Sequence, residues 1–257
     1  MDRERLKNIP VMYLYATSDG YMWLSYRSIL AKYDINGQLV KEYPLRNKYG
    51  RTTISGFCES RNHEIIISVW NGRVYHLDKE KDEFVPYPDK MRRQNPTVMV
   101  QDNEQDYFWL ATWGDGVVRF DPSAPEDSMF VYSEIPINAA GEEDGVILSL
   151  VQDDKLGYIW LTTGHDFMSL QIQPDKTLKQ LKFQTGLLPV NHMLVEVLKG
   201  RGCLWVSAFD RPSFIVHLMD NMTKDYALPA LADRVNRSPA AVSYTHLRAH
   251  ETEADLV

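Results

Sequence analysis

Short apolar runs separated by polar turns recur along the chain from residue 11 onward. We expect strands at residues 11–17, 97–101 and 146–152. Each is followed by a turn containing Asp with Gly or Asn, residue types that tolerate the positive φ of tight hairpins. No run is long enough to favour a helix, so the pattern predicts short antiparallel strands throughout.

A second motif follows each of these turns and repeats through the chain. An aromatic and aliphatic segment surrounds a tryptophan, for which isoleucine substitutes once; the five positions are Trp23, Ile66, Trp109, Trp160 and Trp205. They are separated by 43, 43, 51 and 45 residues. Third strands are expected at 29–34, 73–78 and 117–121, and fourth strands at 39–43, 84–87 and 129–132.

Four short strands in each unit of about 40–50 residues are typical of a β-propeller blade. One blade cannot bury both of its faces, so neighbouring blades cover them, and tryptophan is large enough to fill the space between. We therefore predict an all-β chain of about five four-stranded blades forming an incomplete ring. The expected blades are 9–50, 51–92, 93–143, 144–188 and 189–235, within a repeat region of 9–240 that follows a lead-in at 1–8. A parallel β-helix is the alternative, although its repeats are usually shorter.

The clearest unit, residues 97–132, reads TVMVQDNEQDYFWLATWGDGVVRFDPSAPEDSMFVY. It resembles the two-component regulator propeller repeat. Residues 146–163 (VILSLVQDDKLGYIWLTT) and 11–26 (VMYLYATSDGYMWLSY) are similar to the same pattern. The second and fifth units depart from it, because Ile66 replaces the tryptophan and the segment beginning Phe209-Asp210-Arg211 replaces the glycine-rich loop.

This resemblance implies a periplasmic sensor region of a hybrid two-component system, in which oligosaccharides are the usual signals and the histidine kinase lies outside this chain. The expected function is ligand sensing without catalysis or a cofactor. The expected partners are an oligosaccharide, further propeller blades or a second copy of the receptor. A non-catalytic scaffold for protein contacts is one alternative, and a propeller lyase or glycosidase is another.

Candidate ligand-binding residues lie in the loops after the tryptophan-bearing strands, which share one face of a propeller. Exposed rings can stack on the C–H faces of sugars, while charged ends supply hydrogen bonds. The candidates are Arg27, Trp70, Trp113, Asp115, His165, Asp166, Asp210 and Arg211. The competing interpretation is that Trp113 packs only against the next blade and that its neighbouring glycines serve only the turn.

Acidic turns at 102–104, 142–144 and 153–154 could supply oxygen ligands to Ca²⁺. We expect these acids to be solvated turn residues instead, and we predict no metal site.

Charge and hydropathy narrow the function further. The net charge is −7 and no basic patch is evident, so a nucleic-acid partner is not expected. No run of 18 apolar residues is present, so no membrane contact is expected. The N-terminal residues show no signal-peptide pattern, so the periplasmic localisation rests on the resemblance alone.

The last residues, 241–257, are unlike the repeats. Residues 242–252 (VSYTHLRAHET) resemble a direct translation of adapter DNA used in transposase-based sequencing libraries. We therefore expect this tail to be non-native, and we exclude its His246 and His250 from metal binding despite their helical spacing.

Overall fold

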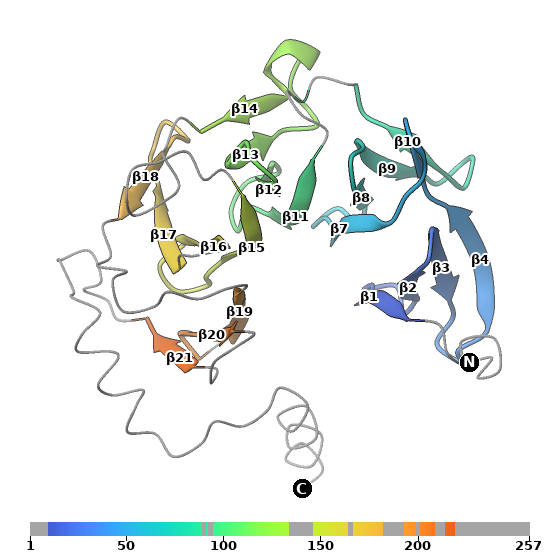
Figure 1. Cartoon of the computed structure of the whole chain (residues 1–257), viewed down its shortest axis with the longest axis horizontal. Helices are drawn as coiled ribbons and strands as arrows, with labels where there is room; N and C mark the ends of the chain where they lie inside the picture. The colour runs from blue at the N-terminus through green and yellow to red at the C-terminus, as the bar shows by residue number, and fades with distance from the viewer. Residues whose placement is uncertain are drawn as a thin grey trace, which may run out of the picture. The chain divides into compact units, whose positions relative to one another are not determined.

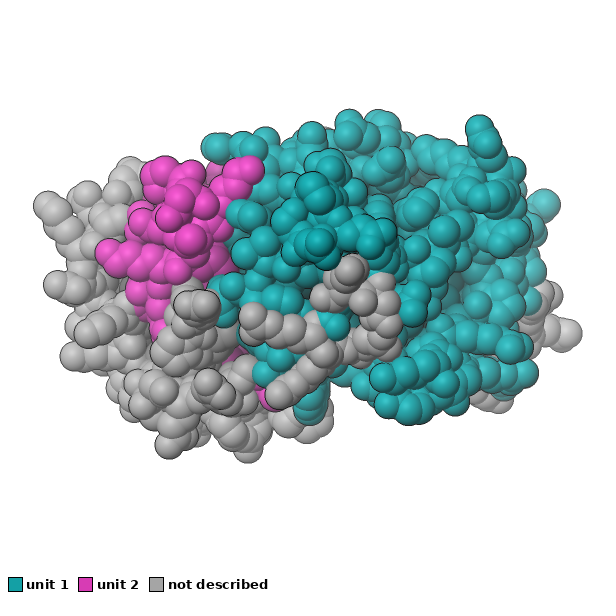
Figure 2. Space-filling model, turned by 90° about the horizontal axis from the view of Figure 1, so that it is seen from above, with its two compact units in different colours: residues 1–134 teal, residues 135–257 magenta. Residues whose placement is uncertain are grey.

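The computed structural model describes residues 10–88, 91, 95–133, 146–163, 167–181, 193–198, 201–208 and 214–218. Regular structure in these residues is β-strand, apart from one short 3-10 helix, η1 (Glu126–Ser128). The chain forms two compact units, residues 1–134 and 135–257 (Figure 2). The expected lead-in and tail both lie outside the described residues.

Unit 1 contains three four-stranded antiparallel sheets whose strands follow chain order, as in propeller blades (Figure 1). Within each blade the strands are named A to D in that order. Their bounds are β1 (Val11–Ala16), β2 (Met22–Tyr26), β3 (Ile29–Tyr33) and β4 (Leu39–Pro44) in blade 1; β7 (Ile54–Glu59), β8 (Ile65–Val69), β9 (Val74–Asp78) and β10 (Glu83–Pro86) in blade 2; and β11 (Pro96–Gln101), β12 (Phe108–Thr112), β13 (Val117–Phe120) and β14 (Phe130–Tyr132) in blade 3.

An additional hairpin joins blade 1 to blade 2 and was not predicted. It consists of β5 (Arg46–Asn47) and β6 (Gly50–Arg51). Gly50 has a φ of 115°, in the left-handed region that glycine adopts most readily.

Unit 2 contains two further sheets of the same type. Blade 4 is four-stranded; its strands are β15 (Ile147–Gln152), β16 (Ile159–Thr163), β17 (Phe167–Ile172) and β18 (Leu178–Leu181). Three strands of blade 5 are described: β19 (Met193–Leu198), β20 (Cys203–Ala208) and β21 (Phe214–His217). The predicted all-β fold of propeller blades is confirmed.

The five expected tryptophan positions all lie on strand B, as predicted. In blades 1 to 3, Trp23 pairs across the sheet with Tyr15, Ile66 with Cys58, and Trp109 with Val100. Because side chains alternate along a strand, this shared register directs each of these residues to the same face of its blade.

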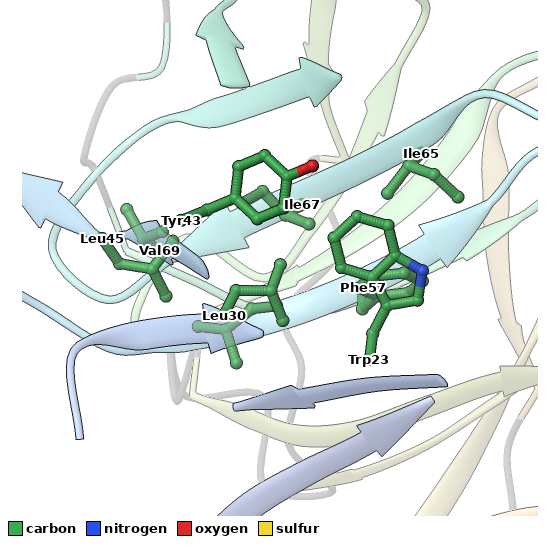
Figure 3. Close-up of a cluster of buried hydrophobic side chains, with 9 residues drawn as sticks. Trp23, Leu30, Tyr43, Leu45, Phe57, Ile65, Ile67 and Val69 are labelled. Atoms are coloured by element: carbon green, nitrogen blue, oxygen red, sulfur yellow. The ribbon is translucent and has the colours of Figure 1, made fainter. Parts of the chain in front are cut away.

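Blades 1 and 2 pack through a large apolar cluster (Figure 3). Its buried members are Trp23, Leu30, Tyr43 and Leu45 from blade 1 and its connection, and Ile54, Phe57, Ile65, Ile67 and Val69 from blade 2. The Trp23 ring stacks on Tyr43 at 5.6 Å between centroids and tilts against Phe57 at 5.7 Å. The predicted role of the tryptophan, filling the space between blades, is confirmed for this pair.

Ile66 takes the same role between blades 2 and 3. It is fully buried in a second cluster with Phe108, Leu110, Val118 and Phe120 of blade 3. Isoleucine can replace tryptophan here because this interface obtains its aromatic volume from the neighbouring blade.

The acid that opens the A–B turn is buried in blades 3 and 4, which corrects the expectation of solvated turn acids. Asp102 is 3% exposed and Asp153 is 0% exposed. The Oδ2 atom of Asp102 accepts the indole N–H of Trp109 at 2.9 Å, and Asp153 Oδ2 accepts that of Trp160 at 2.7 Å. Their Oδ1 atoms accept backbone N–H groups of the turn. Each carboxylate thus satisfies buried donors that would otherwise lack a partner.

The other two blades of unit 1 vary this arrangement. In blade 1 the Thr17 hydroxyl accepts the Trp23 indole N–H at 3.3 Å. In blade 2 Ser60 opens the turn, and the Ile66 side chain has no N–H to satisfy. In the described residues, no helix has the length and apolar character needed to cross a membrane.

Candidate functional site

One end of the blades in unit 1 carries the B–C loops and the connections from strand D to the next strand A; we call it the B–C face. The A–B and C–D turns form the opposite end, the A–B face. Arg27, Trp70 and Trp113 each follow the last residue of strand B in blades 1, 2 and 3. The repeat therefore places three of the predicted site residues at equivalent positions on the B–C face.

Trp70 and Trp113 come together across the seam between blades 2 and 3. Their ring centroids lie 5.9 Å apart with an interplanar angle of 66°, an edge-to-face arrangement. Trp113 is 48% exposed, whereas Trp70 is half-buried. The interpretation of Trp113 as a packing residue alone accounts for its edge contact, but not for the half of its surface that faces solvent.

The backbone of both tryptophans is held from two sides. Trp70 donates its N–H to the carbonyl of Thr53 at 3.0 Å, and Trp113 donates its N–H to that of Asn95 at 2.9 Å. The Trp70 carbonyl accepts the Asn47 amide at 2.7 Å and the Thr52 hydroxyl at 2.8 Å. The Asn95 side-chain amide donates in the same way to the Trp113 carbonyl. Both rings are therefore presented from fixed backbone, which lowers the entropy lost on binding.

The unpredicted β5–β6 hairpin borders this pair. Besides the Asn47 bond to Trp70, Asn47 accepts the backbone N–H of Tyr49 at 2.8 Å. Tyr49 is 76% exposed at the hairpin tip, and the Lys48 amino group lies 5.2 Å from its ring centroid. The sequence signal for these residues is the Asn-Lys-Tyr-Gly turn, which lies at the expected boundary between the first two blades.

The remaining predicted site residues divide into two groups. Arg27 is exposed with a φ of 53°, and Asp115 is half-buried, its backbone N–H bonded to the Thr112 hydroxyl at 3.0 Å. Gly114 and Gly116 both have positive φ, so their role in the turn is confirmed. The other four predicted residues, His165, Asp166, Asp210 and Arg211, lie outside the described residues.

A Ser, His and Glu cluster on the A–B face has the composition of a hydrolytic triad but not its geometry. Ser18 Oγ lies 2.8 Å from Nδ1 of His63, and the same Nδ1 lies 3.0 Å from the Glu59 carboxylate. In a triad the serine and the acid contact different ring nitrogens. Glu59 also accepts the Ser18 backbone N–H at 2.8 Å and its hydroxyl directly, so the cluster links blade 1 to blade 2.

Burial alone would raise the pKa of Glu59, but the hydrogen bonds from Ser18 and the neighbouring His63 outweigh it and hold the pKa below its usual value. Glu59 is thus an ionised acceptor and not a proton donor at neutral pH. Within the described ranges, no three His, Cys, Asp or Glu side chains gather as a metal site would require.

Solved structures with similar folds include two extracellular domains from B. thetaiotaomicron. One belongs to a hybrid two component system, with 20% identity, a TM-score of 0.60 and coverage of 80% of this chain and 27% of that chain. The other belongs to a one component system, with 15% identity, a TM-score of 0.59 and coverage of 80% and 28%. The chain thus spans less than a third of the length of either domain.

Virginiamycin B lyase from Staphylococcus aureus is also similar, with 16% identity, a TM-score of 0.57 and coverage of 83% of this chain and 71% of that chain. No protein-family model matches the chain, and no curated protein matches it. At these identities the similarities show the propeller fold, which sensors and a lyase share.

Proposed function

We propose that this chain is a ligand-sensing section of a bacterial hybrid two-component signalling receptor, located outside the cytoplasm, and that it binds an oligosaccharide without transforming it. The observation that carries the proposal is the Trp70 and Trp113 pair, whose backbone is fixed from both sides while the Trp113 ring remains half exposed. The fold shared with extracellular domains of signalling systems supports the same assignment.

The arrangement suits binding more than chemistry. An aromatic ring offers a sugar an apolar surface, and the bordering asparagine and charged side chains offer hydrogen bonds at its edges. The half-buried Asp115 is the one acid among the described loop residues of the B–C face. A glycosidase would need two carboxyl groups facing each other across the bound sugar.

The test is calorimetric titration of the full chain with a panel of plant and host oligosaccharides, using the wild type, Trp113→Phe and Trp113→Ala. We expect the phenylalanine variant to retain most of the affinity. The alanine variant should bind more than about tenfold more weakly, as expected for a central aromatic contact. Ile35→Ala is the control, because Ile35 is 83% exposed in a C–D turn on the opposite face.

Unchanged affinity in a folded Trp113→Ala variant would move the ligand away from this face. Binding of no oligosaccharide, together with self-association or capture of a purified receptor domain, would favour the alternative of a scaffold for protein contacts. Release of a shortened or unsaturated sugar product would show catalysis and overturn the sensing proposal.

A further inference from the structure

Charge is distributed unequally between the two faces of unit 1. On the A–B face, the A–B and C–D turns of blades 1 to 3 contain eleven acidic residues and three basic ones. On the B–C face, the described loop residues contain five basic residues and one acidic one. The chain as a whole is acidic, with a net charge of −7, so the cationic character of the B–C face is not a consequence of overall composition.

The positive charge gathers beside the tryptophan pair. The β5–β6 hairpin contributes three exposed cations, Arg46, Lys48 and Arg51, within six residues. Arg46 and Lys48 flank Asn47, whose amide bonds the Trp70 carbonyl at 2.7 Å. Among the described residues, no carboxylate forms an ion pair with any of these three side chains. Their charge is therefore available to a ligand.

Arg27 extends this surface on blade 1. It occupies the register position that Trp70 and Trp113 hold in the next two blades, and it is exposed. The carbonyl of the following residue, Ser28, accepts the backbone N–H of Leu45 at 2.8 Å, directly before the hairpin. Arg27 thus lies on the same face as the hairpin cations and the two tryptophans.

We propose that the oligosaccharide bound here is acidic, carrying carboxylate or sulfate groups that the hairpin cations recognise while its rings stack on Trp113. This inference rests on the proposed function and narrows it to a class of ligand. Arginine recognises planar carboxylates and sulfates through paired, charge-assisted hydrogen bonds. A neutral glycan can accept hydrogen bonds from these three cations, but it gains no charge–charge attraction from them.

The first experiment compares chemically matched ligands on the intact chain. Oligogalacturonate is titrated beside its methyl ester, and a chondroitin sulfate oligosaccharide beside its desulfated, carboxyl-reduced form. We expect at least one acidic member to bind, and its neutral counterpart to bind at least about tenfold more weakly. Raising the salt from about 0.05 M to about 0.5 M should weaken only the acidic member.

The second experiment locates the charge with paired variants. Lys48→Gln/Arg51→Gln should weaken binding of that acidic oligosaccharide about tenfold or more and leave the salt dependence shallower. The control Lys79→Gln/Lys81→Gln removes the same charge from the opposite face and should leave the affinity unchanged. A single-stranded thymidine oligonucleotide is the control for non-specific attraction, because it is a polyanion whose charge lies on phosphates and not on carboxylated or sulfated sugars.

The outcomes separate this inference from the proposed function. Equal binding of neutral and acidic counterparts, lost in Trp113→Ala, would overturn the acidic ligand and leave the oligosaccharide sensor standing. Two results would show only general attraction of polyanions and would overturn the inference. One is an equal loss of affinity in Lys48→Gln/Arg51→Gln and in the control Lys79→Gln/Lys81→Gln. The other is binding of the oligonucleotide as tight as that of the acidic oligosaccharide. Binding of no acidic and no neutral oligosaccharide would overturn both proposals.

Discussion

Asp153→Ala should be among the more destabilising single substitutions in unit 2. The Asp153 carboxylate is 0% exposed, and two of its hydrogen bonds join fully buried atoms. These are the backbone N–H of Tyr158 at 3.1 Å and the indole N–H of Trp160 at 2.7 Å. Alanine would remove this acceptor from both buried donors.

The magnitude follows from those two donors. A buried donor left unsatisfied costs about 1–3 kcal/mol, so we expect Asp153→Ala to lower the free energy of unfolding by about 2–6 kcal/mol. Ser60→Ala, at the equivalent turn of blade 2, should cost only about 0.5–1.5 kcal/mol, because Ser60 accepts the Glu64 backbone N–H and the Ile66 side chain has no N–H that needs an acceptor.

Urea unfolding monitored by circular dichroism measures both changes, and hydrogen exchange of the 147–163 segment shows whether the loss is local. A double-mutant cycle with Trp160→Phe should give a coupling energy of about 1 kcal/mol or more. An Asp153→Ala variant within about 0.5 kcal/mol of the wild type, or a coupling near zero, would refute the role assigned to this carboxylate.

Three further predictions concern the contacts between blades of unit 1. Trp23→Ala should cost about 3–5 kcal/mol in urea unfolding, because the buried ring fills the space between blades 1 and 2; a cost below about 1 kcal/mol would contradict this packing. The hydrogen bonds of ionised Glu59 should stabilise the fold above the unfolded-state pKa near 4.5, and this stabilisation should be lost as the pH falls through the lower folded-state pKa. The acid-side decline in melting temperature should therefore be smaller in Glu59→Gln than in the wild type. Parallel pH profiles for the two proteins would contradict this role of Glu59. Arg61 donates to the carbonyls of Asp102 and Asn103 at 2.8 Å, so Arg61→Ala should cost about 1 kcal/mol, with Lys79→Ala as the exposed control; equal melting temperatures for the two would contradict that link.

The repeat made the fold predictable from sequence. A tryptophan near the start of strand B and an Asp or Gly turn before it fix the register of each hairpin, so strand positions such as 117–121 were predicted to within a residue of β13. The β5–β6 hairpin was not predicted because strands of two residues are too short to show the alternation of apolar and polar positions that predicts a strand.

The candidate site was predicted only in part, for a related reason. The loop positions of Trp70 and Trp113 followed from the repeat. The contact between their rings depends on how blades 2 and 3 pack together, and the sequence of a single repeat does not determine that packing. The acids Asp102 and Asp153 were wrongly expected to be solvated. Their burial depends on an indole N–H seven residues further along the chain, and a turn considered alone does not reveal that partner.

The hydrogen bond between the residue that opens the A–B turn and the tryptophan on strand B limits how these repeats can change over evolution. An indole and its acceptor behave as a single heritable pair: blades 3 and 4 carry a tryptophan with an aspartate, blade 1 carries Trp23 with the Thr17 hydroxyl, and blade 2 lacks both the indole and the aspartate. Replacing Ile66 with tryptophan alone would bury a donor beside a serine already engaged by the turn. A designer building a regular array from this repeat should therefore copy each tryptophan together with the acceptor from its own turn, or omit both.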